Sequence, residues 1–250
     1  MRKSHLFTTL FVSIAIALIS FSFNNPSAKK AAAASVATIA IADSVTTPET
    51  KAATLSAALY EKLDLANLNL SQEALDYAIK GYEKLNASGA VNNNRYLTVI
   101  DFSQSGRQKR FYLIDMHEQK LVMNTFVSHG KNTGLDMAKD FSNTMNSEKS
   151  SLGFYITDAT YTGKHGMSLR LKGQEEGFNS NAMARGIVVH GAAYVNAGRV
   201  NSAFMGRSQG CPALPEAEYA KAINYIKDGS VMFIYHPMQN SVQQSPILNS

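Results

Sequence analysis

Cys211 is the only cysteine in this 250-residue chain, and it lies in a polar segment. The segment reads Gly-Arg-Ser-Gln-Gly-Cys-Pro-Ala over residues 206–213, so Cys211 stands between Gly210 and Pro212. Glycine and proline on either side predict a tight bend, at which successive backbone N–H groups can point at one position. Free cysteines are usually buried and act as small apolar residues, but the residues around Cys211 do not form an apolar run. We therefore interpret Cys211 as a nucleophile.

His190 is the candidate base for this thiol. It ends the apolar run 187–189 and is followed by Gly191, a pattern that predicts a strand with an imidazole at its end. A cysteine attacks as the thiolate, so a base must take its proton or its pKa must fall. An imidazole does this and later protonates the leaving amine. The backbone N–H groups of Gly210 and Cys211 are candidates for stabilising the oxyanion, so these residues together predict acyl transfer from an amide.

Four histidines besides His190 follow the N-terminal segment, and a role is expected for each. His129 and His165 also precede a glycine, and each is either a substrate contact or a structural histidine in a turn. His117 and His236 are expected at the surface or at strand ends. One cysteine and no histidine pair at ligand spacing give too few ligands for zinc, so we expect neither a metal nor a cofactor.

Two polar pairs resemble motifs of hydrolases. Ser150 and Ser151 lack the elbow that surrounds a nucleophilic serine in α/β-hydrolases, so we expect them in a loop. Glu175 and Glu176 could suggest paired glycosidase carboxylates, but adjacent residues on an extended segment point apart. We expect this glutamate pair on a solvated loop.

The elements that carry these residues are predicted to be mostly strands. Residues 96–102, 110–116 and 121–127 are rich in β-branched and aromatic residues and are separated by polar turns, which predicts an antiparallel meander. The same criteria predict further short strands at 152–157, 168–171, 186–190 and 231–235. The polar residues 129–150 predict a long ordered loop, and loops of this length usually serve a site.

Helices are expected before the meander and near the C-terminus. Ser71 can cap a helix whose apolar residues recur every three or four positions up to Gly89. A shorter helix is expected around 55–63, and an amphipathic one at 216–227. The predicted fold class is therefore mainly β with some α.

The N-terminus predicts export. Arg2, Lys3 and His5 precede the apolar run 6–23, and small residues follow it, as in a secretory signal. If left uncleaved, this run is long enough to anchor the chain, because spanning a membrane takes roughly 17 to 25 apolar residues. We expect the rest of the chain in the periplasm or cell envelope, with membrane contact only through this segment.

The net charge limits the binding partners to be expected, and the single cysteine limits the possible states of the thiol. The formal net charge is +5, and no run of like charges alternates with aromatic residues, so nucleic acid is not an expected partner. Cysteines of exported proteins are usually paired, and a single cysteine cannot pair within its own chain. The remaining states are an inert thiol, an intermolecular disulfide or a reactive thiol.

The two central motifs, at 190–191 and 208–211, resemble the signature of the YkuD-like L,D-transpeptidases. The closer similarity is to the branch of murein L,D-transpeptidase catalytic domain proteins, and further hallmarks of that branch have similar segments here in the same order. Those segments are 127–130, 141–143, 150–155, 163–166, 168–171 and 181–182. The resemblance covers roughly residues 96–235.

The resemblance implies a β-sandwich-like catalytic domain in which Cys211 and His190 face a substrate groove. It implies that the thiolate attacks the carbonyl of the third residue of a peptidoglycan stem peptide and releases the terminal D-alanine. An amine of a neighbouring stem then resolves the thioester and forms a cross-link. Gly191 matches a position whose carbonyl orients the histidine in some members, and Ser208 and Arg207 match residues that shape the loop and contact substrate.

This chain also departs from the pattern of many relatives. Gln209 stands where many members have a histidine, and the interval from His190 to Cys211 is slightly longer, which an insertion at 196–202 would explain. Two alternatives stay open: an L,D-carboxypeptidase that uses water as the acceptor, and a non-catalytic peptidoglycan-binding protein with an inert Cys211. The sequence does not separate transfer from hydrolysis, because acceptor choice depends on groove shape and water exclusion.

These observations predict five segments. They are a signal peptide or N-terminal anchor at 1–28, a linker at 29–53, a helical segment at 54–90, the catalytic domain at 91–238 and a polar tail at 239–250.

Overall fold

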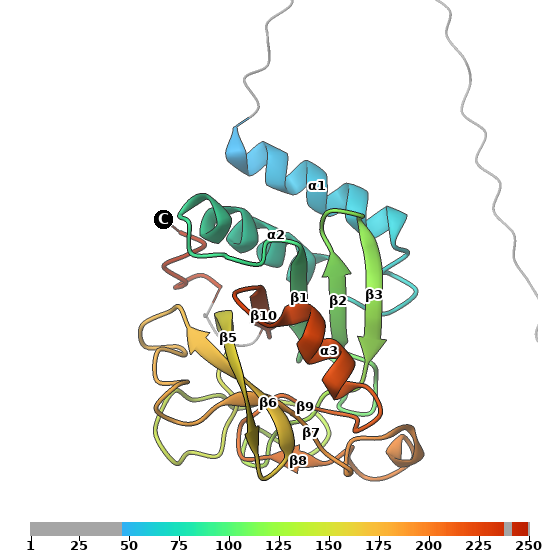
Figure 1. The fold of residues 1–250 in the computed structure, drawn as a ribbon. Coiled ribbons are helices and arrows are strands. Elements are labelled where there is room, and N and C mark those ends of the chain that lie inside the picture. Colours follow the sequence, from blue (N-terminus) through green and yellow to red (C-terminus); the bar gives the residue numbers. More distant parts are fainter. Residues whose placement is uncertain (1–46, 238–241, 250) are drawn as a thin grey trace, which may run out of the picture. The chain divides into compact units, whose positions relative to one another are not determined.

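The computed structural model of the chain describes residues 47–237 and 242–249. The predicted N-terminal segment 1–28 and residues 29–46 of the predicted linker lie outside the described residues. All described residues belong to one compact unit, Val45–Ser250, which Figure 1 shows as a ribbon. No helix in the described part of the chain is long and apolar enough to span a bilayer.

An eight-stranded sheet of order β3-β2-β1-β10-β5-β6-β7-β9 forms the centre of this unit. Its strands are β1 (Tyr96–Asp101), β2 (Phe111–Asp115), β3 (Lys120–Thr125), β5 (Gly153–Gly163), β6 (Gly166–Gly173), β7 (Val188–Gly191), β9 (Ala213–Leu214) and β10 (Val231–Tyr235). The β1–β10 and β7–β9 pairs are parallel and the others are antiparallel, so the predicted meander is confirmed as β1-β2-β3. A separate two-stranded parallel sheet joins β4 (His129–Gly130) to β8 (Arg207–Ser208).

Strand β10, near the middle of the sheet, is buried on both faces, which explains why it is apolar along its whole length. The paired residues Val99 and Phe233 point into one apolar cluster, and the next pair, Ile100 and Ile234, points into the other. All five residues of β10 are buried. The predicted fold class, mainly β with some α, is confirmed.

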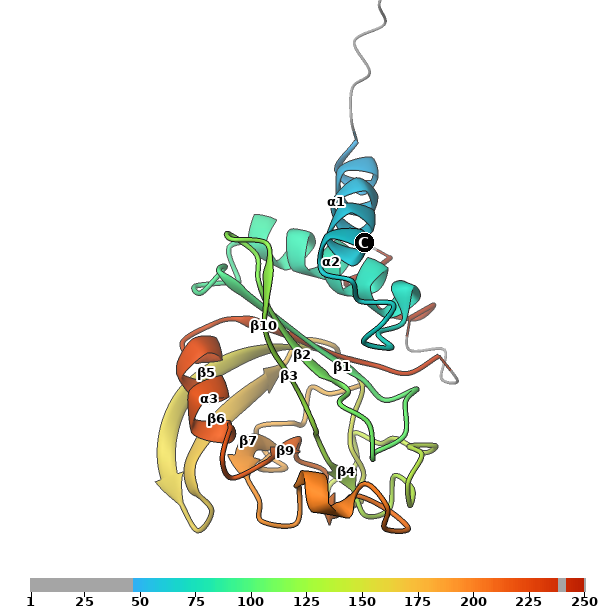
Figure 2. The ribbon, with the colours of Figure 1, turned by 90° about the vertical axis from the view of Figure 1, so that its right-hand side faces the viewer.

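Helices α1 (Pro48–Lys62) and α2 (Gln72–Ala87) cover the first face, and α3 (Tyr219–Ile226) covers the second (Figures 1 and 2). The hydroxyl of Ser71 accepts a hydrogen bond from the Ala74 N–H at 3.3 Å, so this predicted helix cap is confirmed. The apolar stripe of α2 is buried in the first cluster. The helices therefore pack on the sheet that carries the predicted site.

Two helix boundaries differ from the prediction. The first helix starts within the predicted linker 29–53, because Thr47 caps it through the Thr50 N–H and a proline occupies the first helical position. The third helix starts at Tyr219, whereas the amphipathic pattern predicted 216–227.

The C-terminal segment packs on the core, although the sequence predicts a polar tail at 239–250. Leu248 is buried in the first apolar cluster, and the Ser245 hydroxyl donates to the Glu175 carboxylate. The same carboxylate accepts a hydrogen bond from the Phe154 N–H at 2.6 Å. The prediction of a solvated Glu175 was wrong: its side chain is buried, and burial raises its pKa.

Three other predictions on polar residues can be compared with the structure. Glu176 and His117 are exposed, as expected. His236 follows the end of β10, as predicted, but it is buried, with its ring 5.0 Å from that of Phe141. A surface position for His236 was therefore wrong.

Candidate active site

The β7–β9 register brings the two central motifs together. His190 is paired with Ala213 and Gly191 with Leu214 in parallel strands. Cys211 lies two residues before Ala213, in the segment 206–212 that leads into β9, which we call the nucleophile loop. Strand pairing therefore places the end of this loop beside β7, although the chain separates Cys211 from His190 by about twenty residues.

Cys211 is a free cysteine, and the residue is partly exposed. Its Sγ donates a long hydrogen bond of 3.7 Å to the Gly186 carbonyl. One side of the cysteine packs against the second apolar cluster. The residue is therefore held in place by its surroundings and still open to a reactant, which distinguishes it from a fully buried structural cysteine.

The imidazole of His190 is oriented by its own strand end. Only 4% of the residue is exposed, and its Nδ1 lies 2.8 Å from the Gly191 carbonyl oxygen. A carbonyl oxygen only accepts hydrogen bonds, so Nδ1 carries the proton and Nε2 keeps a lone pair. The contact implied for Gly191 is therefore present, and His190 is in the tautomer that a general base needs.

Burial sets the protonation state of both groups. It lowers the pKa of His190, and the charges of His165 and Lys164 lower it further, while the bond to the Gly191 carbonyl acts in the opposite direction. Burial also raises the pKa of Cys211, against a backbone hydrogen bond and the positive charges of Arg185 and Lys164. Both shifts favour the uncharged forms, a thiol at Cys211 and a neutral imidazole at His190.

His165 lies at the site, on the turn between β5 and β6. Its exposed ring stacks on the ring of His190, with centroids 4.5 Å apart and planes inclined by 25°. The structure therefore brings one of the two additional histidine candidates into contact with the candidate base. Contact of His165 with substrate stays a prediction.

His129 is the other additional candidate, and its burial contradicts contact with substrate. It is 1% exposed, and its Nδ1 lies 2.7 Å from Nη2 of Arg110. Arginine only donates, so Nδ1 accepts, and the protonated Nε2 faces the Gly134 carbonyl at 3.3 Å. Protonation of Nδ1 would turn it into a second donor facing the Arg110 donor and would place two positive charges side by side. Burial first and the Arg110 charge second lower the pKa of His129 to about 3.

This histidine should make the fold sensitive to acid. The folded pKa of His129 lies below its ordinary value of 6.5, so its contribution to stability is complete above pH 6.5 and is lost as the pH falls toward 3. We expect the free energy of unfolding to fall by on the order of 3 kcal/mol between pH 7 and 4.5 from this group. Urea unfolding at both pH values measures the difference. His129→Gln can keep both hydrogen bonds without titrating and should flatten the pH dependence, whereas the exposed His117→Gln should not. If the free energy of unfolding changed equally with pH in all three proteins, this assignment would be contradicted.

Ser208 shapes the nucleophile loop from within. Its buried hydroxyl donates to the Cys211 carbonyl at 2.6 Å and accepts from the Gly210 N–H at 3.0 Å. Both hydrogen bonds are internal to the loop, so the hydroxyl is not free for the predicted contact with substrate. They also bear on the two candidate oxyanion donors: the N–H of Gly210 is already engaged by Ser208, so the N–H of Cys211 is the candidate that stays without a partner in the loop.

Gly210 itself is required by the shape of the loop. Its φ of +121° lies in the region that side chains rarely adopt, and a Cβ there would lie 2.7 Å from the Lys149 carbonyl oxygen. Arg207, at the start of the loop, donates to the Lys131 carbonyl at 2.8 Å and lies over the Phe204 ring at 4.6 Å. Arg207 thus ties the nucleophile loop to the long loop 129–150, and its contact with substrate stays a prediction.

Arg185 is a site residue that the sequence analysis missed. Its guanidinium donates to the carbonyls of Ser142 at 2.7 Å and Lys149 at 2.5 Å, so it holds the loop 129–150. Its Nη2 is also 3.3 Å from the position of a Cβ on Gly210. Every hydrogen bond of the Arg185 side chain is to a residue distant in sequence, so no local pattern could have indicated its role. A cavity of about 230 Å³ next to the nucleophile loop is lined by Asn146, Glu148, Arg185 and Gln209.

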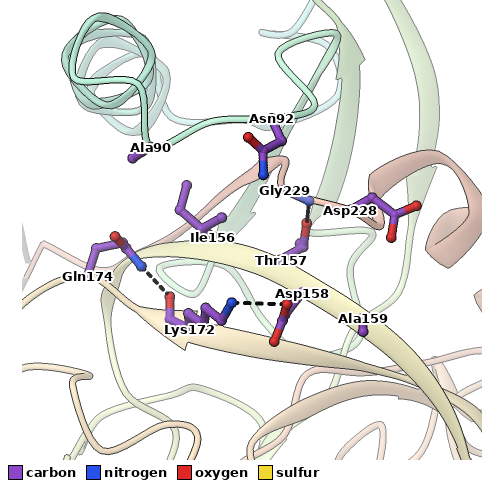
Figure 3. A pocket seen from close by; sticks show the side chains of 10 residues that line it. All are labelled: Ala90, Asn92, Ile156, Thr157, Asp158, Ala159, Lys172, Gln174, Asp228 and Gly229. Carbon is purple, nitrogen blue, oxygen red and sulfur yellow. Dashed lines mark hydrogen bonds and ion pairs between the residues drawn. The ribbon is translucent and has the colours of Figure 1, made fainter.

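A larger cavity, of about 410 Å³, has a different lining (Figure 3). It contains neither Cys211 nor His190. Its Lys172 is paired with Asp158 at 3.0 Å, and the Gln174 amide donates to the Lys172 carbonyl (Figure 3). The described residues contain no group of three or more His, Cys, Asp or Glu side chains that could hold a metal ion.

A family model described as the L,D-transpeptidase catalytic domain matches residues 66–235. This range is more than half of the 250 residues, and the chain therefore belongs to the L,D-transpeptidase catalytic domain family. The resemblance drawn from the sequence is confirmed. The matched range includes α2, which the sequence analysis assigned to a helical segment ahead of the domain.

Several solved structures are similar to this chain. An L,D-transpeptidase from Mycobacterium smegmatis has 14% identity, coverage of 57% of this chain and 59% of that chain, and a TM-score of 0.37. One from Mycobacterium tuberculosis H37Rv has 13% identity, coverage of 57% and 58%, and a TM-score of 0.34. One from Stackebrandtia nassauensis has 11% identity, coverage of 75% and 90%, and a TM-score of 0.35. The chain spans less than two thirds of the first two, and comparison with curated proteins gave no match.

Proposed function

We propose that this protein is a cysteine-dependent L,D-transpeptidase that cross-links peptidoglycan stem peptides. The observation that carries the proposal is that the β7–β9 pairing brings the end of the nucleophile loop, which holds the partly exposed Cys211, beside His190, whose tautomer is set by the Gly191 carbonyl. Membership of the family supports the same reaction type. The N-terminal sequence 1–28 supports export to the cell envelope, where peptidoglycan lies.

The first half-reaction forms a thioester. Nε2 of His190 takes the thiol proton of Cys211 as the sulfur leaves its contact with the Gly186 carbonyl and attacks the donor carbonyl. The carbonyl π electrons move to oxygen, and the Cys211 N–H donates to that oxyanion. The C–N bond to the terminal D-alanine then breaks, and the imidazolium returns its proton to the leaving amine.

The second half-reaction transfers the acyl group. An amine of a neighbouring stem gives a proton to His190 as its nitrogen attacks the thioester carbonyl, and the C–S bond breaks to restore the thiol. Water in place of the amine would give the carboxypeptidase alternative. The acceptor is therefore chosen by what enters the site after acylation, not by the chemistry of Cys211.

Purified tetrapeptide muropeptides test this proposal directly. We expect cross-linked dimers together with free D-alanine, because the acyl group is passed to an amine. Separation of the products by liquid chromatography with mass spectrometry measures both. Tripeptide monomers alone would favour the carboxypeptidase, and tight binding of muropeptide without any product would favour the non-catalytic alternative.

A further inference from the structure

We propose that Ser150 is a positioning residue for oxyanion stabilisation, which acts by fixing the peptide group between Gly210 and Cys211. This inference rests on the proposed function, because it concerns the acylation of Cys211. Ser150 itself does not touch the sulfur or the donor carbonyl. It holds the backbone that presents the one N–H left for the oxyanion.

The Ser150 hydroxyl joins two loops at a buried point. It donates to the Gly210 carbonyl at 3.0 Å and accepts from the Gly130 N–H at 3.1 Å. The N–H of Ser150 donates to the Thr133 hydroxyl at 2.8 Å. Only 1% of the residue is exposed, so water cannot easily replace these hydrogen bonds. The hydroxyl is therefore fixed by both of its partners.

The planarity of the peptide bond transmits this constraint to Cys211. In a trans peptide, the carbonyl of one residue and the N–H of the next point in opposite directions, and the described residues contain no cis peptide. Because Ser150 holds the Gly210 carbonyl on one side, the Cys211 N–H must point to the other side. Within the described part of the chain, that N–H has no hydrogen-bond acceptor, so it is free for a ligand.

The neighbouring hydrogen bonds leave the loop no second way to hold this peptide. Ser208 engages the N–H of Gly210 and the carbonyl of Cys211, but not the peptide group between the two residues. Gly210 has unusual conformational freedom, which would let that peptide group rotate if it were not held. The hydroxyl of Ser150 is the contact that prevents this rotation.

Two reactions of Cys211 separate this role from a merely structural one. Acylation by a carbapenem proceeds through a tetrahedral oxyanion: the C–S bond forms, the β-lactam C–N bond opens, and the ring nitrogen takes the proton. Alkylation by iodoacetamide forms a C–S bond and releases iodide without any oxyanion. Loss of the hydroxyl should therefore slow the first reaction and spare the second.

The experiment measures both second-order rate constants by mass spectrometry of the intact protein. For Ser150→Ala, we expect carbapenem acylation to fall about 30-fold or more, since loss of an oxyanion donor costs roughly 100- to 1000-fold in turnover, and alkylation to change less than about 3-fold. Ser230→Ala is the matched control. It also removes a buried hydroxyl bonded to a carbonyl, that of Ile226 at 2.6 Å, but in the turn between α3 and β10. Ser150→Thr keeps a hydroxyl and should retain most of the acylation rate.

Each other outcome overturns the proposal. If Ser150→Ala acylates as fast as the unaltered protein, Ser150 does not position the oxyanion donor. If both reactions slow equally in Ser150→Ala, the residue serves the fold and not the oxyanion, whatever the rate of Ser150→Thr. If the unaltered protein is alkylated but never acylated, both the proposed function and the role of Ser150 fail. This outcome differs from the others because it is seen in the unaltered protein, before any variant is compared.

Discussion

Cys211→Ala is expected to remove all measurable cross-linking, with turnover on tetrapeptide muropeptides lowered by at least about 10⁴-fold. The chain has one cysteine, so no other thiol can form the thioester. The reaction divides into two half-reactions through that thioester, and direct attack by the acceptor amine on an amide has no comparable path. This is the largest effect expected from any single substitution in the protein.

The same substitution should hardly change stability, because Cys211 is partly exposed and its one side-chain hydrogen bond is long. The urea midpoint of Cys211→Ala serves as the control for folding. Incubation with a carbapenem should add one adduct mass to the unaltered protein and none to the variant. Cys211→Ser retains a nucleophilic atom of higher pKa and should show only traces of acylation. Cross-linking by the alanine variant would show that the thiol is not the nucleophile.

The site residues that could be predicted from the sequence are those whose neighbours in the chain form a recognisable pattern. His190 and Gly191 follow an apolar run that needs burial, and Gly210 marks a backbone conformation that side chains avoid. Each pattern has a physical cause that acts within a few residues, so a single sequence displays it. The same holds for the meander and for the Ser71 cap, which the structure contains.

The residues that could not be found act across the fold. Ser150 is connected to Gly210 through sixty positions of the chain, and Arg185 to Ser142 through forty-three. Their side chains are ordinary for loops, and only the folded chain gives them partners. Glu175 was misread for the same reason, since a solvated glutamate and one covered by the C-terminal segment have the same local sequence.

Contacts between loops also explain why the sequence left the role of His129 open. A histidine followed by glycine resembles the motif at 190, and the difference lies in what each imidazole faces. His190 faces a backbone carbonyl through Nδ1, so its Nε2 keeps a lone pair that can act as a base. His129 accepts a hydrogen bond from Arg110 through Nδ1 and is closed off from solvent. Two similar dipeptides thus have opposite tautomers. The group that each Nδ1 faces, the Gly191 carbonyl for His190 and the Arg110 guanidinium for His129, decides between them.

His190 provides the second large expected effect, and pH reveals it. His190→Ala should lower kcat/KM by roughly 10²- to 10⁴-fold, because the thiol then has no base to take its proton. Burial lowers the pKa of His190, so the unaltered enzyme should keep its base neutral, and its rate constant for carbapenem acylation high, to a pH below 6.5, the ordinary value. The rate should fall only as the pH drops through that lowered pKa.

The rate of carbapenem acylation of His190→Ala should depend on pH in the opposite way. Without the base, attack requires the thiolate, and burial raises the pKa of Cys211 above its ordinary value of 9.0, so the rate should climb with pH through the alkaline range. Measuring acylation from pH 4 to 10 for both proteins gives the two profiles, and the exposed His117→Gln should reproduce that of the unaltered enzyme. If His190→Ala kept the acid limb of the parent, the proton acceptor would be another group, and the neighbouring His165, stacked at 4.5 Å, would be the first to test.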